Sequence, residues 1–381
     1  MDSIDNLKTL SNGILYLELD GSEGRYEMGL QHGRALRERI CSCIDYVKAS
    51  YERELGGRTE AFLHRLLSET GYLADAKRYL PNIYEEMQGI ADGCGRPLED
   101  VYLINCLDEG YYLMLEESAC KCTCIGIPAR GSRPNMLGQN LDFEDAYNGY
   151  QTVFRIRLPE HEFLLYGFCG QLMGMGMNER GISVIANAVG NGRISPEHGV
   201  SNTLMQRAFY ECESVEECLD LLKSCPRSTA TAYTIADFNT VRCFEATAGE
   251  VAEVPPCVCI TAGTGEAAGC AHTNHLLAST DTRDAAGVCE GQIIYRDENG
   301  LSWEMTEERL VLAQKFVREH CTDCTEKEIM EFLSTPPVLR DYGQETIQSF
   351  VSVSDPQCPR IYVAGDRNNR GFVRLDLFQA D

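Results

Sequence analysis

The spacing of hydrophobic positions divides the chain into a helical first third and a strand-rich remainder. Between residues 26 and 54, apolar side chains recur at intervals of three and four, which predicts an amphipathic helix. Further helices are predicted over residues 60–79 and 83–93 and after Pro97. We therefore expect the first 115 residues to be mostly helical.

After Cys122 the pattern changes to short runs typical of β-strands, interrupted by two pairs of helices. The predicted strands cover residues 152–158, 163–168, 182–188, 232–236, 241–246, 346–353, 360–364 and 372–378, and the predicted helices cover 202–210, 215–222, 306–319 and 326–333. Strands joined by short turns, with helices in separate groups, favour antiparallel sheets covered by helices, which is an α+β fold. We expect one compact unit with a helical N-terminal segment packed on it.

The composition narrows the class of protein. The chain has 381 residues and a formal charge of −24, which argues against nucleic-acid binding and disfavours a polyphosphate substrate such as a coenzyme A thioester. The start of the chain, Met1 to Asn6, lacks the basic and apolar parts of a signal peptide. No apolar run approaches the roughly 18 residues that a membrane helix needs. We therefore expect a cytoplasmic protein without a membrane partner.

Nineteen cysteines are many for such a chain, and an odd number cannot pair completely. Free thiols in a reducing cell are the simplest interpretation. Cys120, Cys122 and Cys124 would share one face of a strand, so a metal-binding or thiol-redox protein remains the alternative hypothesis. Cys321 and Cys324 have a metal-like spacing but lack a second pair at zinc-finger distance, so we expect no metal and no cofactor.

The segment around Cys122 predicts a β-hairpin. Lys121 and Cys122 open a β-capable run that reaches Ile127, and residues 129–134 form a polar turn. The return strand ends near the carboxylate of Asp142. A Cys-Thr pair at the head of a strand, with an Asp beyond the return strand, resembles the start of the catalytic chain in N-terminal-nucleophile hydrolases, which implies a nucleophilic role for Cys122.

Five motifs resemble one family, and they occur in the family's order. They are YEMGLQHG at 26–33, EMQGIADG at 86–93, Cys-Thr at 122–123 with GQNLD at 138–142, GMNERGI at 176–182, and HTNH at 272–275. Together they resemble the penicillin acyltransferase-like family of autoproteolytic N-terminal-nucleophile hydrolases. The resemblance implies a four-layer αββα sandwich cut at Lys121-Cys122. Residues 1–121 would then form a helical N-terminal chain and residues 122–381 the catalytic chain, and the two would stay associated.

The resemblance also implies roles for individual residues. Cys122 would be the nucleophile, Asp142 would hold its α-amine, and the Asn274 amide would donate to the oxyanion. Asn187 and Arg340 would complete the oxyanion or substrate-binding site. The ordinary alternatives are a buried thiol for Cys122, a strand-end residue for Asp142 and a turn residue for Asn274.

The chemistry explains why the thiol would have to be terminal. A cysteine thiol has a pKa of about 8.5 and an α-amine one of about 7.7–8.0, so the amine can take the thiol proton near neutral pH. The implied function is hydrolysis or acyl transfer on a small N-acyl amide through an acyl-thioester on Cys122. Hydrolysis is favoured, because water is always available and the acidic chain offers no evident coenzyme A cradle. Neither the acyl group nor the amine follows from the sequence.

Overall fold

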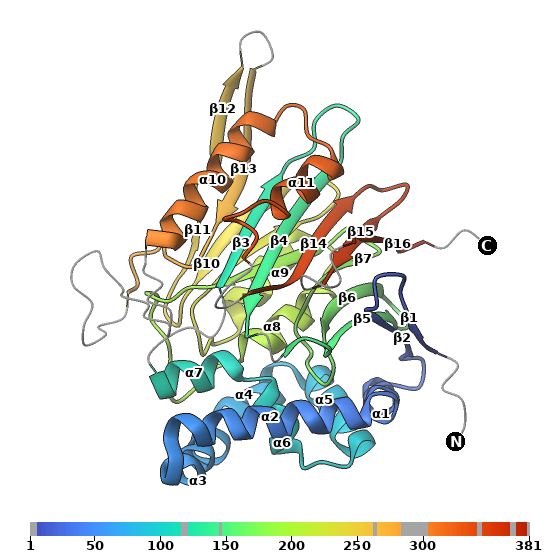
Figure 1. Cartoon of the computed structure of the whole chain (residues 1–381), viewed down its shortest axis with the longest axis vertical. Helices are drawn as coiled ribbons and strands as arrows, with labels where there is room; N and C mark the ends of the chain where they lie inside the picture. The colour runs from blue at the N-terminus through green and yellow to red at the C-terminus, as the bar shows by residue number, and fades with distance from the viewer. Residues whose placement is uncertain are drawn as a thin grey trace.

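The computed structural model describes residues 6–115, 121–144, 147–261, 265–282, 304–340, 345–365 and 371–378. The fold is α+β, with two β-sheets above a helical N-terminal region (Figure 1). The helices are α1 (Arg25–Ala35), α2 (Arg37–Leu55), α3 (Thr59–His64), α4 (Tyr72–Tyr79), α5 (Pro81–Cys94), α6 (Leu98–Ile104), α7 (Leu107–Leu115), α8 (Asn202–Phe209), α9 (Val215–Ser224), α10 (Glu304–His320) and α11 (Glu326–Leu333). None of these helices has the length and hydrophobicity needed to cross a lipid bilayer.

Within the described residues the first sheet has nine strands, in the order β1-β2-β5-β6-β7-β8-β9-β10-β11. Its strands are β1 (Leu7–Thr9), β2 (Leu15–Asp20), β5 (Gln151–Arg157), β6 (Glu162–Phe168), β7 (Gly174–Asn178), β8 (Ser183–Ala188), β9 (Thr231–Ala236), β10 (Val241–Ala246) and β11 (Val251–Glu253). Its pairs are antiparallel except β2 with β5, which run parallel. The first 115 residues are mostly helical, as expected, but they begin with β1 and β2, which the hydrophobic pattern did not predict.

The second sheet has seven described strands, in the order β12-β13-β3-β4-β14-β15-β16. Its strands are β3 (Lys121–Ile127), β4 (Asn135–Phe143), β12 (Cys257–Thr261), β13 (Gly265–His272), β14 (Glu345–Ser354), β15 (Arg360–Ala364) and β16 (Val373–Asp376). β3 and β4 form the predicted hairpin, with Cys122 opposite Leu141. Every residue of β4 is buried, so both faces of this sheet are covered.

The two larger hydrophobic clusters of the described residues hold these layers together. The larger core joins the nine-stranded sheet, the inner face of the seven-stranded sheet and the N-terminal helices. The smaller core lies between the seven-stranded sheet and helices α10 and α11, and includes Ile125, Val351, Val317 and Leu333. Helices α10 and α11 lie across the front of this sheet in Figure 1. On the nine-stranded sheet, α8 contacts β7 and α9 contacts β10.

Two of the family-like motifs form one helix crossing. They lie on α1 and α5, and glycines line the contact between the two backbones. A Cβ on Gly89 would lie 2.0 Å from the Tyr26 carbonyl oxygen, and one on Gly29 would lie 2.0 Å from the Glu86 carbonyl oxygen. Since real Cβ atoms do not approach so closely, only glycine permits this packing. The motifs therefore serve the fold of the N-terminal region.

His32, from the first of these motifs, also has a structural role. It is buried, and its Nε2 accepts a hydrogen bond of 3.0 Å from the Gly170 N–H. Burial lowers its pKa to about 3, so the ring stays neutral near pH 7. His32 therefore ties α1 to the turn after β6.

The predicted helices are interrupted more often than their hydrophobic pattern suggests. The stretch from 26 to 54 is two helices, α1 and α2, which meet at Leu36. Gly71 separates α4 from the helical turns that precede it. By contrast, α11 begins at Thr325 with a complete capping box to Glu328, as its sequence predicts.

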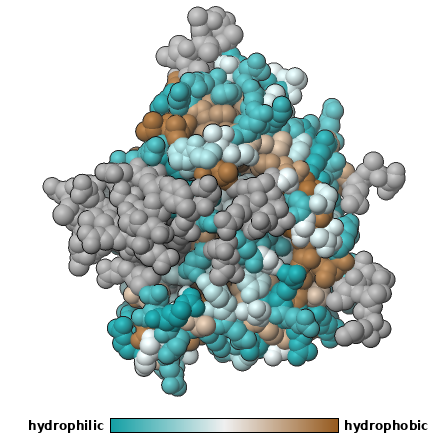
Figure 2. Space-filling model, in the orientation of Figure 1, coloured by the Kyte–Doolittle hydropathy of each residue, from teal (hydrophilic) through white to brown (hydrophobic). Residues whose placement is uncertain are grey.

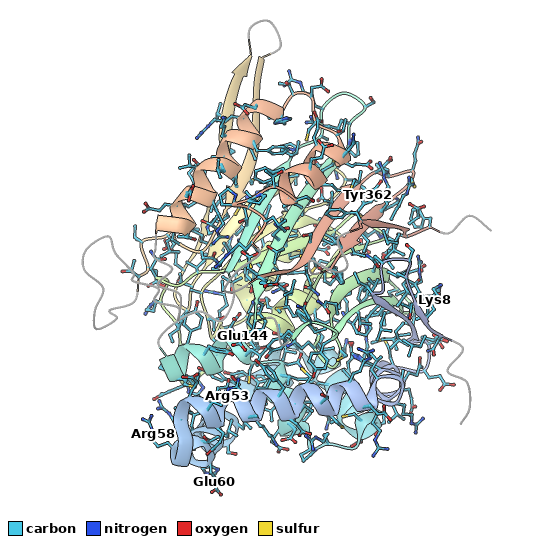
Figure 3. The ribbon with its side chains drawn as sticks, viewed as in Figure 1. Lys8, Arg53, Arg58, Glu60, Glu144 and Tyr362 are labelled. Carbon is cyan, nitrogen blue, oxygen red and sulfur yellow. The ribbon has the colours of Figure 1, made fainter. Side chains whose placement is uncertain are left out.

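The helical region is joined to the sheets close to the candidate site. Glu144 follows β4 and accepts hydrogen bonds from Tyr46 on α2 and from Tyr111 on α7. Figure 3 shows Glu144 at this junction, with Arg53 of α2 below it. The face of the helical region that is visible in Figure 2 is mostly hydrophilic. The end of the β3–β4 hairpin is therefore fixed against α2 and α7.

Candidate active site

The Cys122 side chain lies in the interior of the protein. Cys122 is the second residue of β3 and is 1% exposed. It lines a pocket of about 420 Å³, a volume that includes the pocket's open mouth. The lining residues are Asp108, Cys122, Gln139, Leu141, Gly167, Phe168, Met173, Gly174, Met175, Ala186, Ala188, Asn202, Gln206 and Gln348. The thiol thus faces a small pocket that is apolar on most sides.

In the uncut chain the thiol is poorly ionised. Burial raises the pKa of Cys122 well above its usual value, and the negative charge of Asp142 raises it further. The Gln139 side chain and the Arg309 guanidinium act in the opposite direction, and Asp108 adds to the rise. An isolated thiol in this position needs a base to become a nucleophile.

Asn274 contacts the backbone nitrogen of Cys122. Its Oδ1 accepts a hydrogen bond of 3.1 Å from the Cys122 N–H, and its Nδ2 donates to the Ala188 carbonyl at 3.0 Å. Arg309 fixes this orientation of the amide, because its guanidinium can only donate and lies 3.1 Å from Oδ1. Of the two N–H bonds on Nδ2, only one is used within the described residues.

Arg309 is the residue that the sequence analysis missed. It projects from α10 and is 1% exposed. Its Nη1 donates to the Cys122 carbonyl oxygen and to the Thr123 Oγ1, both at 2.8 Å. A signal was present in the sequence, because Arg309 falls on the buried stripe of α10 with Ala313 and Phe316. A charge on such a stripe indicates a buried polar partner.

Asp142 lies on the other face of β3 from the thiol. It pairs across the sheet with the Lys121 position on β3 and with Thr346 on β14, one residue along from the Cys122–Leu141 pair that lines the pocket. Thr346 Oγ1 donates to Asp142 Oδ1 at 2.6 Å, and Arg309 Nη1 lies 3.6 Å from Asp142 Oδ2. Asp142 is therefore beside the predicted cleavage position but faces α10 rather than the pocket.

Hydrogen bonds between the Arg340 backbone and Thr346 hold Arg340 near the sheet face that carries Asp142. Its N–H donates to Thr346 Oγ1 at 2.9 Å, and its carbonyl accepts from the Thr346 N–H at 3.0 Å. Its positive charge acts together with burial to lower the pKa of Arg309. Thr346 thus links Arg340 to Asp142.

Asn187 lies on β8, a strand that borders the pocket, but its own side chain does not line the pocket. Its Nδ2 is 3.5 Å from the His272 carbonyl oxygen, and its side chain lies beside Cys124. Its neighbours Ala186 and Ala188 line the pocket, whereas Asn187 is directed toward β13 and β3. The Asn187 side chain is therefore placed beside Cys124 rather than beside the Cys122 thiol.

A buried carboxylate anchors the segment that carries Asn274. Glu245 on β10 accepts from His272 Nε2 at 2.9 Å and from the backbone N–H groups of Ala278 and Ser279 at 2.9 and 2.7 Å. Burial opposes ionisation, but these bonds lower the pKa of Glu245. The turn that bears Asn274 is thereby held on both sides.

The metal or redox alternative rests partly on Cys120, which lies outside the described residues. Cys122 and Cys124 are described, and both are buried free thiols. Among the described side chains there is no group of three or more that could hold a metal ion. Cys122 instead makes hydrogen bonds through its backbone with Asn274 and Arg309.

A cysteine at the head of a strand, with an Asn at its nitrogen and a buried Arg–Asp pair behind it, is an arrangement suited to acyl-group chemistry. The model of the family described as acyl-coenzyme A:6-aminopenicillanic acid acyl-transferase matches residues 129–334. The chain therefore belongs to this family. It is also similar to the 40 kDa form of the acyl-coenzyme A:6-aminopenicillanic-acid-acyltransferase of Emericella nidulans, with 26% identity over 254 residues, or 66% of this chain and 67% of the relative.

The matched residues cover only part of the candidate site. Asp142, Asn187, Asn274 and Arg309 lie inside the match, whereas Cys122 precedes it and Arg340 follows it. Family membership supports an acyl-transferring enzyme. The assignment of the nucleophile rests on the geometry at Cys122 and on the resemblance of its motif.

Proposed function

We propose that this protein cuts itself between Lys121 and Cys122 and then hydrolyses a small N-acyl amide through an acyl-thioester on Cys122. The observation that carries the proposal is that Cys122 has its nitrogen bonded to Asn274 Oδ1 and its thiol in a small pocket. The layers of the fold agree with an αββα N-terminal-nucleophile sandwich, with α8 and α9 on one sheet and α10 and α11 on the other.

Self-cleavage requires an N-to-S acyl shift. The Cys122 sulfur attacks the Lys121 carbonyl carbon, a C–S bond forms, and the C–N bond breaks as the Cys122 nitrogen takes up the proton. Water then hydrolyses the thioester, which leaves a carboxylate on Lys121 and restores the thiol. Residues 1–121 and 122–381 become separate chains that remain associated.

In turnover, the new α-amine is the base that the buried thiol lacks in the uncut chain. Asn274 Oδ1 already lies 3.1 Å from the nitrogen and orients it toward the thiol. The amine takes the thiol proton, the thiolate attacks the substrate carbonyl, and the leaving amine carries the proton away. Asp142 acts through Thr346 and Arg309 and balances positive charge near the amine.

The oxyanion that forms on the substrate carbonyl needs a donor. We assign this role to the second N–H of Asn274 Nδ2, the first being bonded to Ala188. Arg309 holds the Asn274 oxygen and thereby keeps the N–H groups directed away from itself. We assign to Asn187 and Arg340 the support of this site, through Cys124 and Thr346 respectively.

Hydrolysis is favoured over transfer to a second amine. Among the described residues, the pocket lining contains a carboxylate and no Lys or Arg, and the chain carries a net charge of −24. Neither feature suits the phosphates of coenzyme A. Water is small enough to reach a buried thioester.

The test is the intact mass of the native protein. The wild type should contain chains of 121 and 260 residues, which together make 381, and Cys122→Ala should stay in one piece. Cys124→Ala, two residues along the same strand, is the matched control and should be cut. Iodoacetamide should inactivate the mature enzyme in step with labelling of the peptide that begins with Cys122. Full activity from an uncut wild type would overturn the proposal.

A further inference from the structure

The pocket that contains the Cys122 thiol also contains a carboxylate with no described cationic partner. Asp108, on α7, lines the pocket and is 8% exposed. Within the described residues, its side chain makes one hydrogen bond, from Asn202 Nδ2 at 3.0 Å, and no ion pair. Its charge acts on the Cys122 thiol, whose pKa it helps to raise after burial and Asp142. Asp108 and the nucleophile therefore lie within range of one small ligand.

A hydrogen-bond network fixes the direction of this carboxylate. Asn202 Oδ1 accepts from Gln206 Nε2 at 3.0 Å and from the Tyr233 hydroxyl at 2.8 Å. These donors commit the amide oxygen of Asn202, so its NH₂ group must face Asp108. Asn202 and Gln206 themselves line the pocket. The network therefore holds the Asp108 carboxylate as a hydrogen-bond acceptor facing the pocket, and it does not neutralise the negative charge of that carboxylate.

The other described lining residues do not offset the negative charge of Asp108. They are neutral and include Leu141, Phe168 and Met173. The cationic Arg309 contacts the opposite face of β3, where it serves Asp142. A buried carboxylate without a counter-charge is costly, and burial raises the pKa of Asp108 accordingly. A cation in the pocket would remove much of that cost.

We propose that the pocket accepts acyl groups that carry a protonated amine, which pairs with Asp108 while the acyl carbonyl reaches Cys122. The substrate class is then a small aminoacyl amide, and the inference rests on the function proposed above. The acyl side is the appropriate one, because the acyl group stays bonded to sulfur inside the pocket while the amine product departs. Asp108 is thus a specificity-determining residue.

Matched substrates provide the test on the processed wild-type enzyme. Each pair of p-nitroanilides differs only in an ammonium against a methyl group: glycyl against propionyl, 3-aminopropionyl against butyryl, and 4-aminobutyryl against pentanoyl. At one chain length or more, the ammonium substrate should have a kcat/KM at least about tenfold higher. Equal values for all three pairs would overturn the inference while leaving the hydrolase function intact.

Two variants distinguish a specific pair between Asp108 and the substrate ammonium from a general effect of the protein's negative charge. In Asp108→Asn the ratio of kcat/KM for the ammonium and methyl substrates should fall at least about tenfold. Glu99→Gln removes the same charge from the exposed start of α6 and should leave the ratio unchanged. A ratio unaffected in Asp108→Asn, or lowered equally in Glu99→Gln, would contradict a role for Asp108.

A binding measurement covers the case in which Asp108→Asn fails to fold or be processed. In the wild type, propylammonium should slow iodoacetamide labelling of Cys122 more than 1-propanol at the same concentration. Equal protection would contradict the inference. Wild-type protein that is uncut and forms no acyl adduct at Cys122 would instead refute the proposed function, whereas selective protection by propylammonium would still support a cation site.

Discussion

Asn274 Oδ1 lies 3.1 Å from the backbone nitrogen of Cys122, and the two residues are 152 positions apart in the chain. This nitrogen is the atom that cleavage would convert into an α-amine. The same amide faces the Arg309 guanidinium, which leaves its Nδ2 for Ala188 and for a substrate. In the mechanism proposed above, this one side chain would both orient the base and stabilise the oxyanion.

Asn274→Ala should lower kcat by about 10²–10³ with little change in KM, because a donor used mainly in the transition state is lost. Asn274→Asp separates the two roles, since it keeps the acceptor for the Cys122 nitrogen and loses the N–H. If the Nδ2 N–H stabilises the oxyanion, steady-state kinetics should give a kcat for Asn274→Asp as low as that for Asn274→Ala. Wild-type kcat in both variants would place the oxyanion site elsewhere.

Arg309→Lys should slow self-cleavage and lower kcat by about 10² or more. A lysine ammonium cannot reproduce the fork that binds the Cys122 carbonyl, Thr123 and Asn274 together. Cleavage can be followed by intact mass and turnover by release of the amine. Arg318→Lys, on the exposed side of the same helix, should behave as the wild type. If the two variants cleave themselves and turn over substrate equally well, the Arg309 guanidinium is not needed for either step.

The activity of the processed enzyme should rise with pH, with an apparent pKa at or below about 8. Burial raises the pKa of the Cys122 thiol, so the thiol remains protonated in this range and the α-amine is the group that titrates. Activity is therefore expected to be lost as pH falls through the pKa of the amine. A profile of kcat/KM from pH 5 to 9 checks this, and activity that declines between pH 6 and 8 would contradict it.

Glu109 should make the folded protein less stable as pH rises. Burial, followed by the charge of Asp108, raises its pKa from 4.5 to about 7. The folded state then binds more protons than the unfolded state between these values, so the free energy of unfolding falls with pH across that window. Over this whole window the free energy of unfolding falls by roughly 3 kcal/mol.

Glu109→Gln should remove this part of the pH dependence in urea unfolding measured at pH 5 and pH 8. Glu99→Gln is the exposed control and should follow the wild type. Identical pH dependence in Glu109→Gln and wild type would show that the carboxyl titrates normally.

Gly89→Ala should destabilise the protein by about 3 kcal/mol or prevent folding. The new methyl group would meet the Tyr26 carbonyl, so α1 and α5 would have to separate. Gly57→Ala, in the same helical region, places its Cβ in open space and should be neutral or slightly stabilising. Thermal unfolding of the two variants makes the comparison, and similar Tm values would contradict the close-packed crossing.

The features that the sequence predicted well are local ones. The hairpin around Cys122 follows from two apolar runs and a turn, and the capping box at Thr325 involves residues only three positions apart. The break at Leu36 could not be predicted, because the apolar spacing continues across it and packing against α5 bends the chain. The strand β2 was missed because its partner β5 lies more than 130 residues away.

In the candidate site, too, the residues that could be predicted are the ones placed by local structure. Cys122 and Asp142 could be selected because they lie at the start and end of one hairpin. Arg309 escaped notice because its partners are the carbonyl of Cys122 and the amide of Asn274, which are distant in the chain. Asp108 sits on a helix with no distinctive motif, and only the pocket relates it to the thiol.

The parallel pairing of β2 with β5 has a consequence for maturation. Cleavage at Lys121 would leave β1 and β2 hydrogen-bonded within the nine-stranded sheet, but on a different polypeptide from its other strands. The sheet would have to assemble while the chain is whole, since afterwards two molecules must find each other to complete it. Maturation would therefore be a one-way event, and enzyme once denatured would depend on protein concentration to regain its fold.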